Sequence, residues 1–371
     1  MQCDYFGECG SCTLHDKNYE EQLAFKVSEV SSLFKPLYTK GFDEIKSEPE
    51  AFRARSEFKI WHEDGKMSYA MNHMSKQGYV PITSCSIVSQ SIQDLMPKLL
   101  EAIKEKEMGF KLFHIDFLSS LSSEMIVSLI YHRPLDDAWK IKAEELAQEF
   151  EIKIIGRSRK QKVTLSTDFI VEKLPISGVD YKFVQIENSF TQPNALVNIQ
   201  MVEWVMNEIG NHDSDLLELY CGAGNFTLPL SKCFNKVLAT EISKPSIRAA
   251  LENCKLNDID NITFLRMSSE EFVQAMNQER EFNRLKDVDL QAFEIKSIFL
   301  DPPRSGLDET TTALSQKFDT IIYISCNPQT LKRDLDALSK THEIENMAVF
   351  DQFAYTNHLE MGAILRRKKS L

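Results

Sequence analysis

The chain has 371 residues, of which 43% are hydrophobic and 26% are charged, values typical of a globular protein with two or three domains. A formal net charge of −12 argues against nucleic-acid binding over the whole surface, although it leaves room for one basic face. The first residues do not form a signal peptide, and no apolar run is long enough to span a bilayer. We therefore expect a cytoplasmic protein without membrane contact, whose eight cysteines are metal ligands, reactive thiols or packing residues rather than disulfides.

Three of the cysteines are clustered near the N-terminus. Cys3, Cys9 and Cys12 follow a C-x5-C-x2-C spacing, and the next cysteine along the chain, Cys85, can supply a fourth thiolate. Four cysteines bind zinc or a cubane iron–sulfur cluster. The alternative is a loose tail whose cysteines are unrelated to one another. We predict a metal site on these four residues, and a first segment over 1–46 that also contains a surface helix over 18–37.

Residues 47–180 have the pattern of an α+β domain with its own sheet. Alternating apolar residues predict strands, and a hairpin-type turn over 62–66 joins the first two of them. The expected strands are 52–61, 67–71, 113–118, 125–132 and 152–155, with a helix over 137–150.

Basic and aromatic side chains are interleaved in this α+β domain. Such a mixture suits phosphate contacts combined with stacking on unpaired bases, so we predict an RNA-binding domain. The alternative is a solvated basic face beside ordinary core aromatics. The candidate RNA contacts are Arg53, Arg55, Lys59, Phe113, His132, Arg157 and Arg159.

From residue 181 onward, short apolar strands alternate with helices. This order predicts a mostly parallel, doubly wound α/β sheet. The expected strands are 215–220, 236–240, 262–266, 297–300 and 320–324, followed by two last strands at 347–350 and 362–365.

A glycine-rich turn follows the first of these α/β strands. The pattern Glu218-x-x-x-Gly222-x-Gly224 lies between a strand and a helix, where glycines allow a ligand to approach the backbone closely. Glu241 ends the next strand and can accept hydrogen bonds from ribose hydroxyls. The third glycine of a dinucleotide-binding loop is missing, which favours S-adenosylmethionine over NAD. The alternative is an ordinary strand–helix turn with incidental glycines.

Cys326 lies where a buried strand meets a helix that begins with Asn327 and Pro328. The positive end of the helix dipole and the free backbone N–H groups would favour a thiolate there. The alternative is a buried, unreactive cysteine. The loop that begins with Asp301 also follows a sheet strand, so the donor, Asp301 and Cys326 are expected to share one crevice.

Several motifs together resemble those of the RNA uridine-C5 methyltransferases. They are Gln192-Pro193-Asn194, the segment 218–226, the segment 301–306, Ser325-Cys326-Asn327-Pro328 and His358-Leu359-Glu360. The segments 52–64, 187–194, 272–285 and 350–353 are most similar to the tRNA branch of this family, which makes ribothymidine at position 54 of the T loop.

The resemblance implies a class I, Rossmann-like methyltransferase domain over 181–371 and a monomer that acts on tRNA, with other T-loop-like RNAs such as tmRNA as further partners. It places the nucleophile that adds to uracil C6 on Cys326 and the base that removes the C5 proton on Glu360. Burial should raise the pKa of Glu360. It places the S-adenosylmethionine contacts on Gln192, Tyr220, Asn225, Glu241 and Asp301.

The N-terminal cysteines depart from the pattern of some tRNA-branch members. The set Cys3, Cys9, Cys12 and Cys85 matches the iron–sulfur motif of rRNA-modifying relatives, which implies a [4Fe-4S] cluster, with zinc or no metal as alternatives. An rRNA uridine-C5 methyltransferase therefore remains an alternative. A third possibility, an inactive RNA-binding or folding factor, is disfavoured by the intact Cys326, Glu360 and Asp301.

Overall fold

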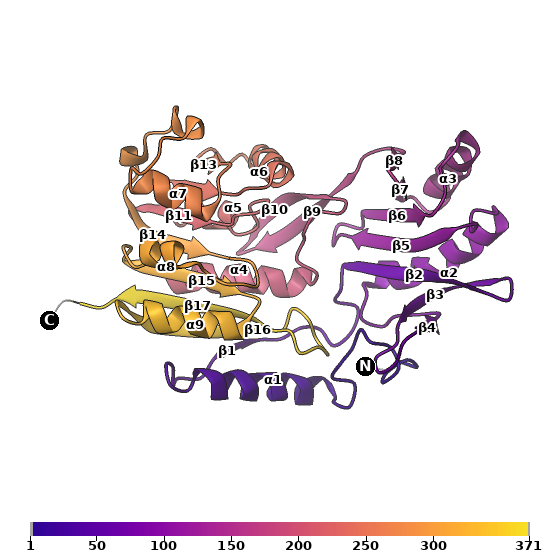
Figure 1. Cartoon of the computed structure of the whole chain (residues 1–371), viewed down its shortest axis with the longest axis horizontal. Coiled ribbons are helices and arrows are strands. Elements are labelled where there is room, and N and C mark those ends of the chain that lie inside the picture. The colour runs from indigo at the N-terminus through magenta and orange to yellow at the C-terminus, as the bar shows by residue number, and fades with distance from the viewer. Residues whose placement is uncertain (1–2, 370–371) are drawn as a thin grey trace.

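The computed structural model describes residues 3–369, which form a large mixed sheet, a smaller sheet and a hairpin between them (Figure 1). The large sheet is mostly parallel, as the alternation of strands and helices predicted. Only β17 runs antiparallel to its neighbours, β15 and β16. In spatial order its strands are β1 (Asp43–Ile45), β16 (His342–Phe350), β17 (Glu360–Arg367), β15 (Thr320–Ser325), β14 (Ile295–Leu300), β11 (Asp215–Leu219), β12 (Val237–Thr240) and β13 (Ile262–Leu265).

Helices cover both faces of the large sheet, because its central strands are apolar on both sides. Alternate residues of β14 show this: Phe299 packs into the core beneath α4, whereas Ile298 packs into the core beneath α1 and α9. The helices are α1 (Tyr19–Phe34), α4 (Ala195–Ile209), α5 (Thr227–Leu230), α6 (Lys244–Leu256), α7 (Ser269–Met276), α8 (Glu309–Ser315) and α9 (Pro328–Leu338), with 3-10 turns at Asn283–Leu285 and Leu290–Ala292.

The smaller sheet forms the α+β unit that the sequence predicted, with more elements than expected. Helices α2 (Gln90–Glu105) and α3 (Asp137–Glu149) pack against it around a separate core that includes Leu99 and Trp139. The pattern analysis did not identify α2, β4 or β8. In spatial order the strands are β4 (Tyr79–Ile82), β3 (Lys66–Asn72), β2 (Arg55–Glu63), β5 (Leu112–Ser119), β6 (Met125–Tyr131), β7 (Lys153–Ser158) and β8 (Gln161–Thr164).

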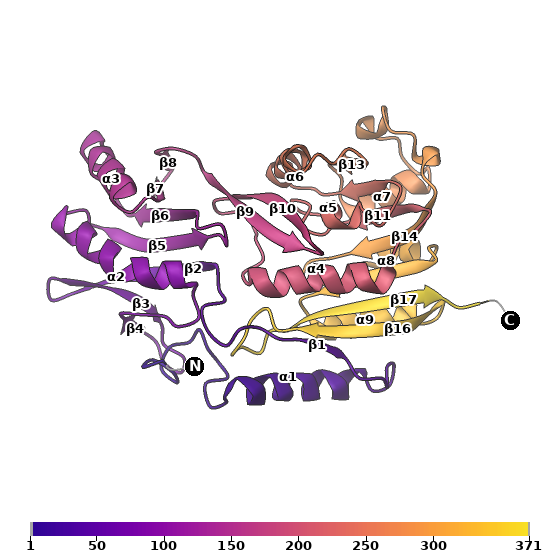
Figure 2. The same cartoon turned by 180° about the vertical axis from the view of Figure 1, so that it is seen from behind.

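A two-stranded hairpin of β9 (Phe169–Ile176) and β10 (Val179–Ile186) connects the two sheets and packs on α4 and α6 (Figure 2). The sequence analysis missed it, because the buried Glu172 interrupts the apolar alternation of β9. The expected domain boundary at residue 180 falls inside this hairpin, and the division into three segments stays a prediction.

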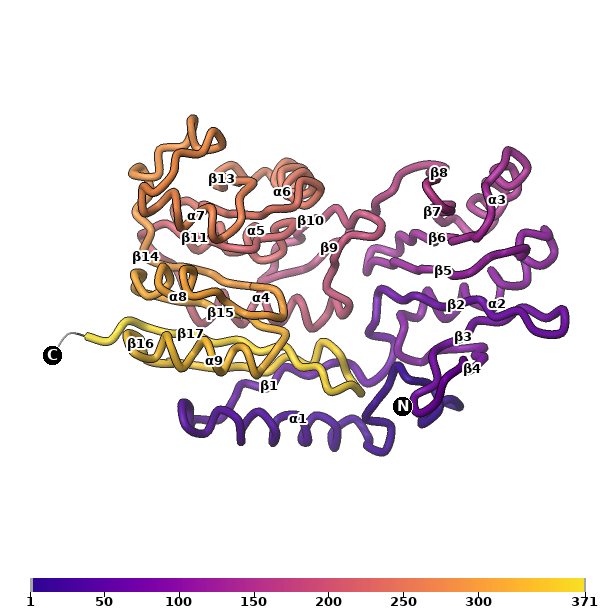
Figure 3. Tube along the Cα trace, in the orientation of Figure 1, coloured from indigo at the N-terminus to yellow at the C-terminus, as the bar shows by residue number. Residues whose placement is uncertain are grey.

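The N-terminal segment contacts both halves of the molecule (Figure 3). The backbone N–H of Gly10 donates to Asn72 of the smaller sheet, whereas that of Leu14 donates to Tyr355, in the loop before β17. Helix α1 then packs along α9 on the large sheet. Among residues 3–369, no helix combines the length and apolar character that crossing a membrane requires.

Candidate functional site

One large cavity, of about 1140 Å³, opens at the carboxyl ends of β11, β12, β14 and β15. The loops after these strands line one part of it, and the segments 188–192 and 353–360 supply further walls. Its volume is sufficient for a ligand of cofactor size with a second group beside it. It is lined by all seven residues that the sequence analysis assigned to the donor or to catalysis, namely Gln192, Tyr220, Asn225, Glu241, Asp301, Cys326 and Glu360.

The loop after β11 has a left-handed backbone at three positions. The φ angles are +65° at Tyr220, +56° at Gly222 and +88° at Gly224. A Cβ atom at Gly224 would lie 2.5 Å from Cδ1 of Leu228, so that position requires glycine. Tyr220 is a bulky residue in a costly conformation, and its hydroxyl is 2.8 Å from Oγ of Ser269. This contact holds the ring at the wall of the cavity.

Glu241, directly after β12, is held against the glycine loop. Its Oε2 accepts a 3.1 Å hydrogen bond from the N–H of Gly222, and its Oε1 accepts a 2.6 Å bond from the N–H of Ser243. The amide of Asn225 exchanges two 2.8 Å hydrogen bonds with Asn198 of α4. The chain therefore orients both side chains before any ligand arrives.

Two carboxyl groups of the cavity wall interact electrostatically. Burial raises the pKa of Asp301, directly after β14, to about 7. Burial, with a further contribution from Asp301, raises the pKa of Glu218 in β11 to about 8. Oε2 of Glu218 has no hydrogen-bond partner within residues 3–369. The sequence analysis gave Glu218 no role of its own, although a glutamate inside an apolar strand is a signal of a functional site.

Helix α9 fixes the loops on which Asp301 and Cys326 lie. As predicted, Asn327 caps this helix, because its side-chain oxygen accepts a hydrogen bond from the backbone N–H of residue 329. The same side chain donates to the carbonyl oxygen of Arg304, at 3.0 Å. Arg333, farther along α9, donates to two more carbonyl oxygens of the 301–307 loop.

Cys326 and Glu360 lie at the same end of two neighbouring strands. In the antiparallel pair of β15 and β17, Ser325 is opposite Met361, so Cys326 and Glu360 occupy the next pair of positions. Glu360 is only 6% exposed, and burial, followed by the charge of Asp301, raises its pKa to about 8. The expectation of a raised pKa for this residue is confirmed.

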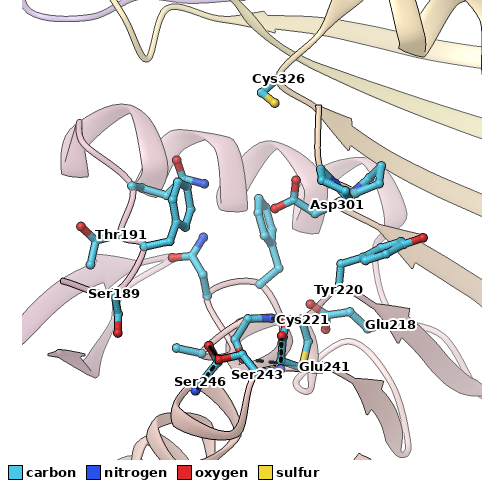
Figure 4. A pocket seen from close by; sticks show the side chains of 18 of the residues that line it. Ser189, Thr191, Glu218, Tyr220, Cys221, Glu241, Ser243, Ser246, Asp301 and Cys326 are labelled. Atoms are coloured by element: carbon cyan, nitrogen blue, oxygen red, sulfur yellow. Dashed lines mark hydrogen bonds between the residues drawn. The ribbon is translucent and has the colours of Figure 1, made fainter. Parts of the chain in front are cut away.

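The setting of Cys326 differs from the expected one. Burial, followed by the carboxyl groups of Glu360 and Asp301, raises the pKa of its thiol to about 11. Arg304 acts in the opposite direction but does not compensate. The prediction of a lowered thiol pKa was therefore wrong for the ligand-free chain, because two carboxyl groups and desolvation outweigh the favourable helix end. Figure 4 shows Asp301 between Cys326 and Glu241 in this view of the cavity.

The segment before α4 contributes buried acceptor atoms to the cavity wall. Within the described residues, neither Oε1 of Gln192 nor Oγ1 of Thr191 has a hydrogen-bond partner, although both atoms are buried. A buried polar atom without a partner costs about 1–3 kcal/mol. A ligand with suitably placed polar groups would recover this cost.

The four N-terminal cysteines line a second cavity, of about 20 Å³. Cys3, Cys9, Cys12 and Cys85 thus lie together, and burial, with contributions from the other three thiols, raises the pKa of Cys12 to about 12. Across residues 3–369, however, no group of three or more His, Cys, Asp or Glu side chains is arranged to hold a metal ion. The metal site stays a prediction.

Four of the candidate RNA contacts are on accessible parts of the smaller domain. The rings of Phe113 and His132 stack with centroids 4.1 Å apart, and both residues are exposed. Nζ of Lys59 lies 3.9 Å from the centroid of the Tyr79 ring. Arg159 is exposed at the turn before β8.

Nζ of Lys59 also donates to Oδ1 of Asn72 at 3.1 Å, and the other three candidates likewise bond within the chain. Nε of Arg53 donates to the carbonyl oxygen of Arg55 at 2.8 Å, and Arg55 itself donates to the carbonyl oxygen of Ser189. Nε of Arg157 donates to Oε1 of Glu187 at 2.6 Å. Arg55 and Arg157 therefore fasten the smaller sheet to the segment that leads into the large cavity, a role that the sequence did not indicate.

The chain has an α/β fold that is known from methyltransferases. It resembles the structure of the Pyrococcus abyssi tRNA (uracil-54, C5)-methyltransferase in complex with S-adenosyl-L-homocysteine, with a TM-score of 0.72 and 22% identity over 96% of this chain and 85% of that one. At the sequence level, the family model for tRNA (Uracil-5-)-methyltransferase matches residues 18–368. The chain belongs to this family.

Relatives match the chain over essentially their whole length. The tRNA/tmRNA (uracil-C(5))-methyltransferase of Aliarcobacter butzleri is 54% identical over 375 residues, which covers 100% of both chains. The protein of the same name from Sulfurimonas denitrificans is 55% identical, over 99% of this chain and 100% of the relative. The tRNA-branch resemblance noted from the motifs therefore extends over the full chain.

Proposed function

We propose that the protein transfers a methyl group from S-adenosylmethionine to C5 of uridine 54 in the T loop of tRNA, and to the equivalent uridine of tmRNA. The observation that carries this proposal is the pairing of Cys326 with the buried Glu360 across β15 and β17, at one end of the large cavity. The names of the close relatives support the same substrates.

The cavity fits S-adenosylmethionine in size and in chemistry. Glu241 can accept hydrogen bonds from the ribose hydroxyls, and the glycine loop leaves the backbone open to a ligand. Gln192, Asn225 and Tyr220 would contact the rest of the donor, and Asp301 would lie near its positive sulfur. When bound, this donor supplies an electrophilic methyl group.

The thiol of Cys326 is the group that activates the uracil. Uracil C5 is a poor nucleophile, and addition of the thiolate to C6 would convert the ring into an enolate. Its C5 would then take the methyl group of a bound donor, whose S–CH3 bond breaks so that the sulfur leaves as a neutral thioether. The thiol must first lose its proton, and its raised pKa makes this step unfavourable in the ligand-free chain. Arg304 is the nearby positive charge that stabilises the thiolate.

Glu360 completes the reaction as the base. After methylation, its carboxylate removes the proton from C5, the electrons of that C–H bond re-form the C5–C6 double bond, and the thiolate leaves C6. A carboxylate in a buried setting is a stronger base than one in water, which suits the task.

The test measures formation of the covalent bond between the RNA and the protein. Cys326→Ala should abolish the covalent complex with 5-fluorouridine-substituted tRNA, whereas Glu360→Gln should let methylated adducts with ordinary tRNA accumulate, both detected on denaturing gels. A covalent complex that persists in Cys326→Ala would exclude this thiol as the nucleophile. In a deletion strain, ribothymidine should disappear at position 54 of tRNA; if it instead disappears from rRNA, the substrate assignment is wrong.

The four clustered cysteines support a separate proposal, a [4Fe-4S] cluster held by Cys3, Cys9, Cys12 and Cys85. Its support is their common cavity and the cysteine spacing, and zinc would use the same thiolates. Iron, sulfide and zinc should be measured after anaerobic purification, beside a Cys12→Ser variant. Metal contents that are equally low in both proteins would exclude the site.

A further inference from the structure

Helix α1 carries a buried lysine, Lys26, whose side chain is 3% exposed. Its ammonium group lies 2.6 Å from Oδ1 of Asp351, 3.1 Å from the carbonyl oxygen of Phe353 and 3.2 Å from that of His358. An ammonium group has three N–H donors, and these three acceptors use all of them. Lys26 therefore joins three points of the loop that connects β16 to β17.

The partner carboxylate is completely buried and bonded on both oxygens. Oδ2 of Asp351 accepts a 2.8 Å hydrogen bond from Nε2 of Gln22, one turn before Lys26 on α1. Oε1 of Gln22 in turn accepts a 3.2 Å bond from the backbone N–H of Tyr355. A buried ion pair costs so much desolvation that it adds little net stability, so stability alone does not account for this pair.

The loop held in this way forms part of the cavity wall and leads directly to Glu360. Phe353 and His358 line the large cavity, and His358 precedes Glu360 by two residues. The loop contains no helix or strand between the end of β16 and the start of β17. Lys26 bonds the carbonyl oxygens of Phe353 and His358 from α1, and Thr356 within the loop also donates to that of Phe353.

We propose that Lys26 is a positioning residue for Glu360: it fixes the 351–358 loop from α1 and so sets the base at the distance that removal of the C5 proton requires. This inference rests on the proposed function, because it assigns Lys26 to one step of that reaction. Donor binding should not depend on Lys26, since Tyr220, Asn225 and Glu241 are on other elements.

Loss of the Lys26 ammonium group should slow removal of the C5 proton without affecting donor binding. Misplacement of a reacting group by about 1 Å costs on the order of 100-fold in rate. In Lys26→Met we expect the turnover number to fall about 10- to 100-fold, while the Kd for S-adenosylmethionine stays within about twofold. Methylated tRNA should remain attached to Cys326 and accumulate as a covalent adduct, as in Glu360→Gln. A loss of folded protein alone would lower the amount of active enzyme without causing any adduct to accumulate.

Two further variants make the test decisive. Lys26→Met/Asp351→Asn removes both buried charges, so no unpaired charge remains to unfold the protein, yet the carbonyl oxygens of Phe353 and His358 still lose their hydrogen bonds from Lys26. Lys46→Met is the matched control, because Lys46 forms an exposed 2.7 Å ion pair with Glu20, which is on α1 like Lys26. The control should turn over like the unmodified enzyme.

The outcomes distinguish the two proposals. Adducts in the double variant but not in the control support the role of Lys26. A folded double variant that turns over normally, or slows without adducts, overturns it. An unmodified enzyme that methylates no tRNA would instead contradict the proposed function.

Discussion

The carboxyl group of Glu360 determines the pH at which the proposed reaction can finish. Its pKa of about 8 means that the base is mostly protonated at neutral pH in the ligand-free chain. Glu360 acts after the methyl group has been transferred, so its protonation limits release of the methylated adduct. We expect the rate of adduct release to rise about tenfold per pH unit on the acidic side of pH 8. The Cys326 thiol, whose pKa is also raised, slows the earlier addition step at low pH.

Asp301 provides the matched variant for this prediction. Its charge contributes to the raised pKa of Glu360, so Asp301→Asn should move the rising part of the profile to lower pH while weakening donor binding. Adduct release between pH 6 and 9, followed in single turnovers with donor and tRNA saturating, measures the shift. A release rate that does not change with pH over this range would show that Glu360 is not the group that limits this step.

Among the single residues of the site, the sequence predicted those that a local motif identifies. Cys326 and Asp301 each follow an apolar strand and begin a distinctive turn, and the strand–turn–helix order alone places them in one crevice. Glu360 was assigned through resemblance, because a single glutamate before an apolar strand has no distinguishing neighbour. Lys26 was missed, since its partner Asp351 is more than 300 positions away in the chain. A lysine on a helix is ordinarily exposed.

At the scale of elements, the smaller sheet is attached to the cavity by two arginines that the sequence analysis assigned to RNA. Arg157 bonds to the nearly buried Glu187, whereas Arg159, two residues later, is exposed. Loss of a phosphate contact lowers the slope of log K against log salt by about 0.7–0.9. We expect Arg159→Gln to lower this slope for tRNA binding, and Arg157→Gln to leave it unchanged.

Arg157→Gln should act on the segment over 187–192 instead. Because it leaves the carboxylate of Glu187 without its main partner, it should destabilise the protein by about 1–3 kcal/mol and weaken donor binding through Gln192. Thermal unfolding and donor titration measure the two effects. If Arg157→Gln changes the salt slope as much as Arg159→Gln does, Arg157 contacts RNA after all.

In β9 and α1, a residue with a tertiary role interrupts the apolar pattern. Glu172 interrupts β9 and accepts a 2.8 Å hydrogen bond from the backbone N–H of Leu121. In α1, the periodicity identified Leu23 and Val30 but not Gln22 and Lys26, which are buried on the same side of the helix. Such residues are favourable only because of distant partners, so local periodicity cannot reveal them.

On the scale of the whole molecule, several buried carboxyl groups should make the ligand-free protein less stable as the pH rises. The pKa values of Asp301, Glu218 and Glu360 are raised to about 7, 8 and 8, whereas in the unfolded chain they return to ordinary values near 4. Between the unfolded-state and the folded-state pKa values, the folded state binds more protons than the unfolded state, so the free energy of unfolding decreases with increasing pH. Each group contributes up to about 1.4 kcal/mol per pH unit.

We therefore expect the Tm of the ligand-free protein to fall from pH 5 to pH 8, as measured by calorimetry. Glu218→Gln should flatten this dependence, because it removes one of the titrating groups and retains the shape of the side chain. A Tm that rises over the same interval would contradict the assignment of protonated carboxyl groups to the folded state.

The position of β17 has a consequence for how the protein is made. This strand comes last among the described strands in chain order, yet it lies between β16 and β15 in the sheet. Before β17 is translated, the growing chain cannot join β16 and β1 to the rest of the sheet, and it lacks Glu360, the first residue of β17. Methylation must therefore wait until β17 has been made, so a product cut short before residue 360 would have Cys326 but no base to release the RNA from it.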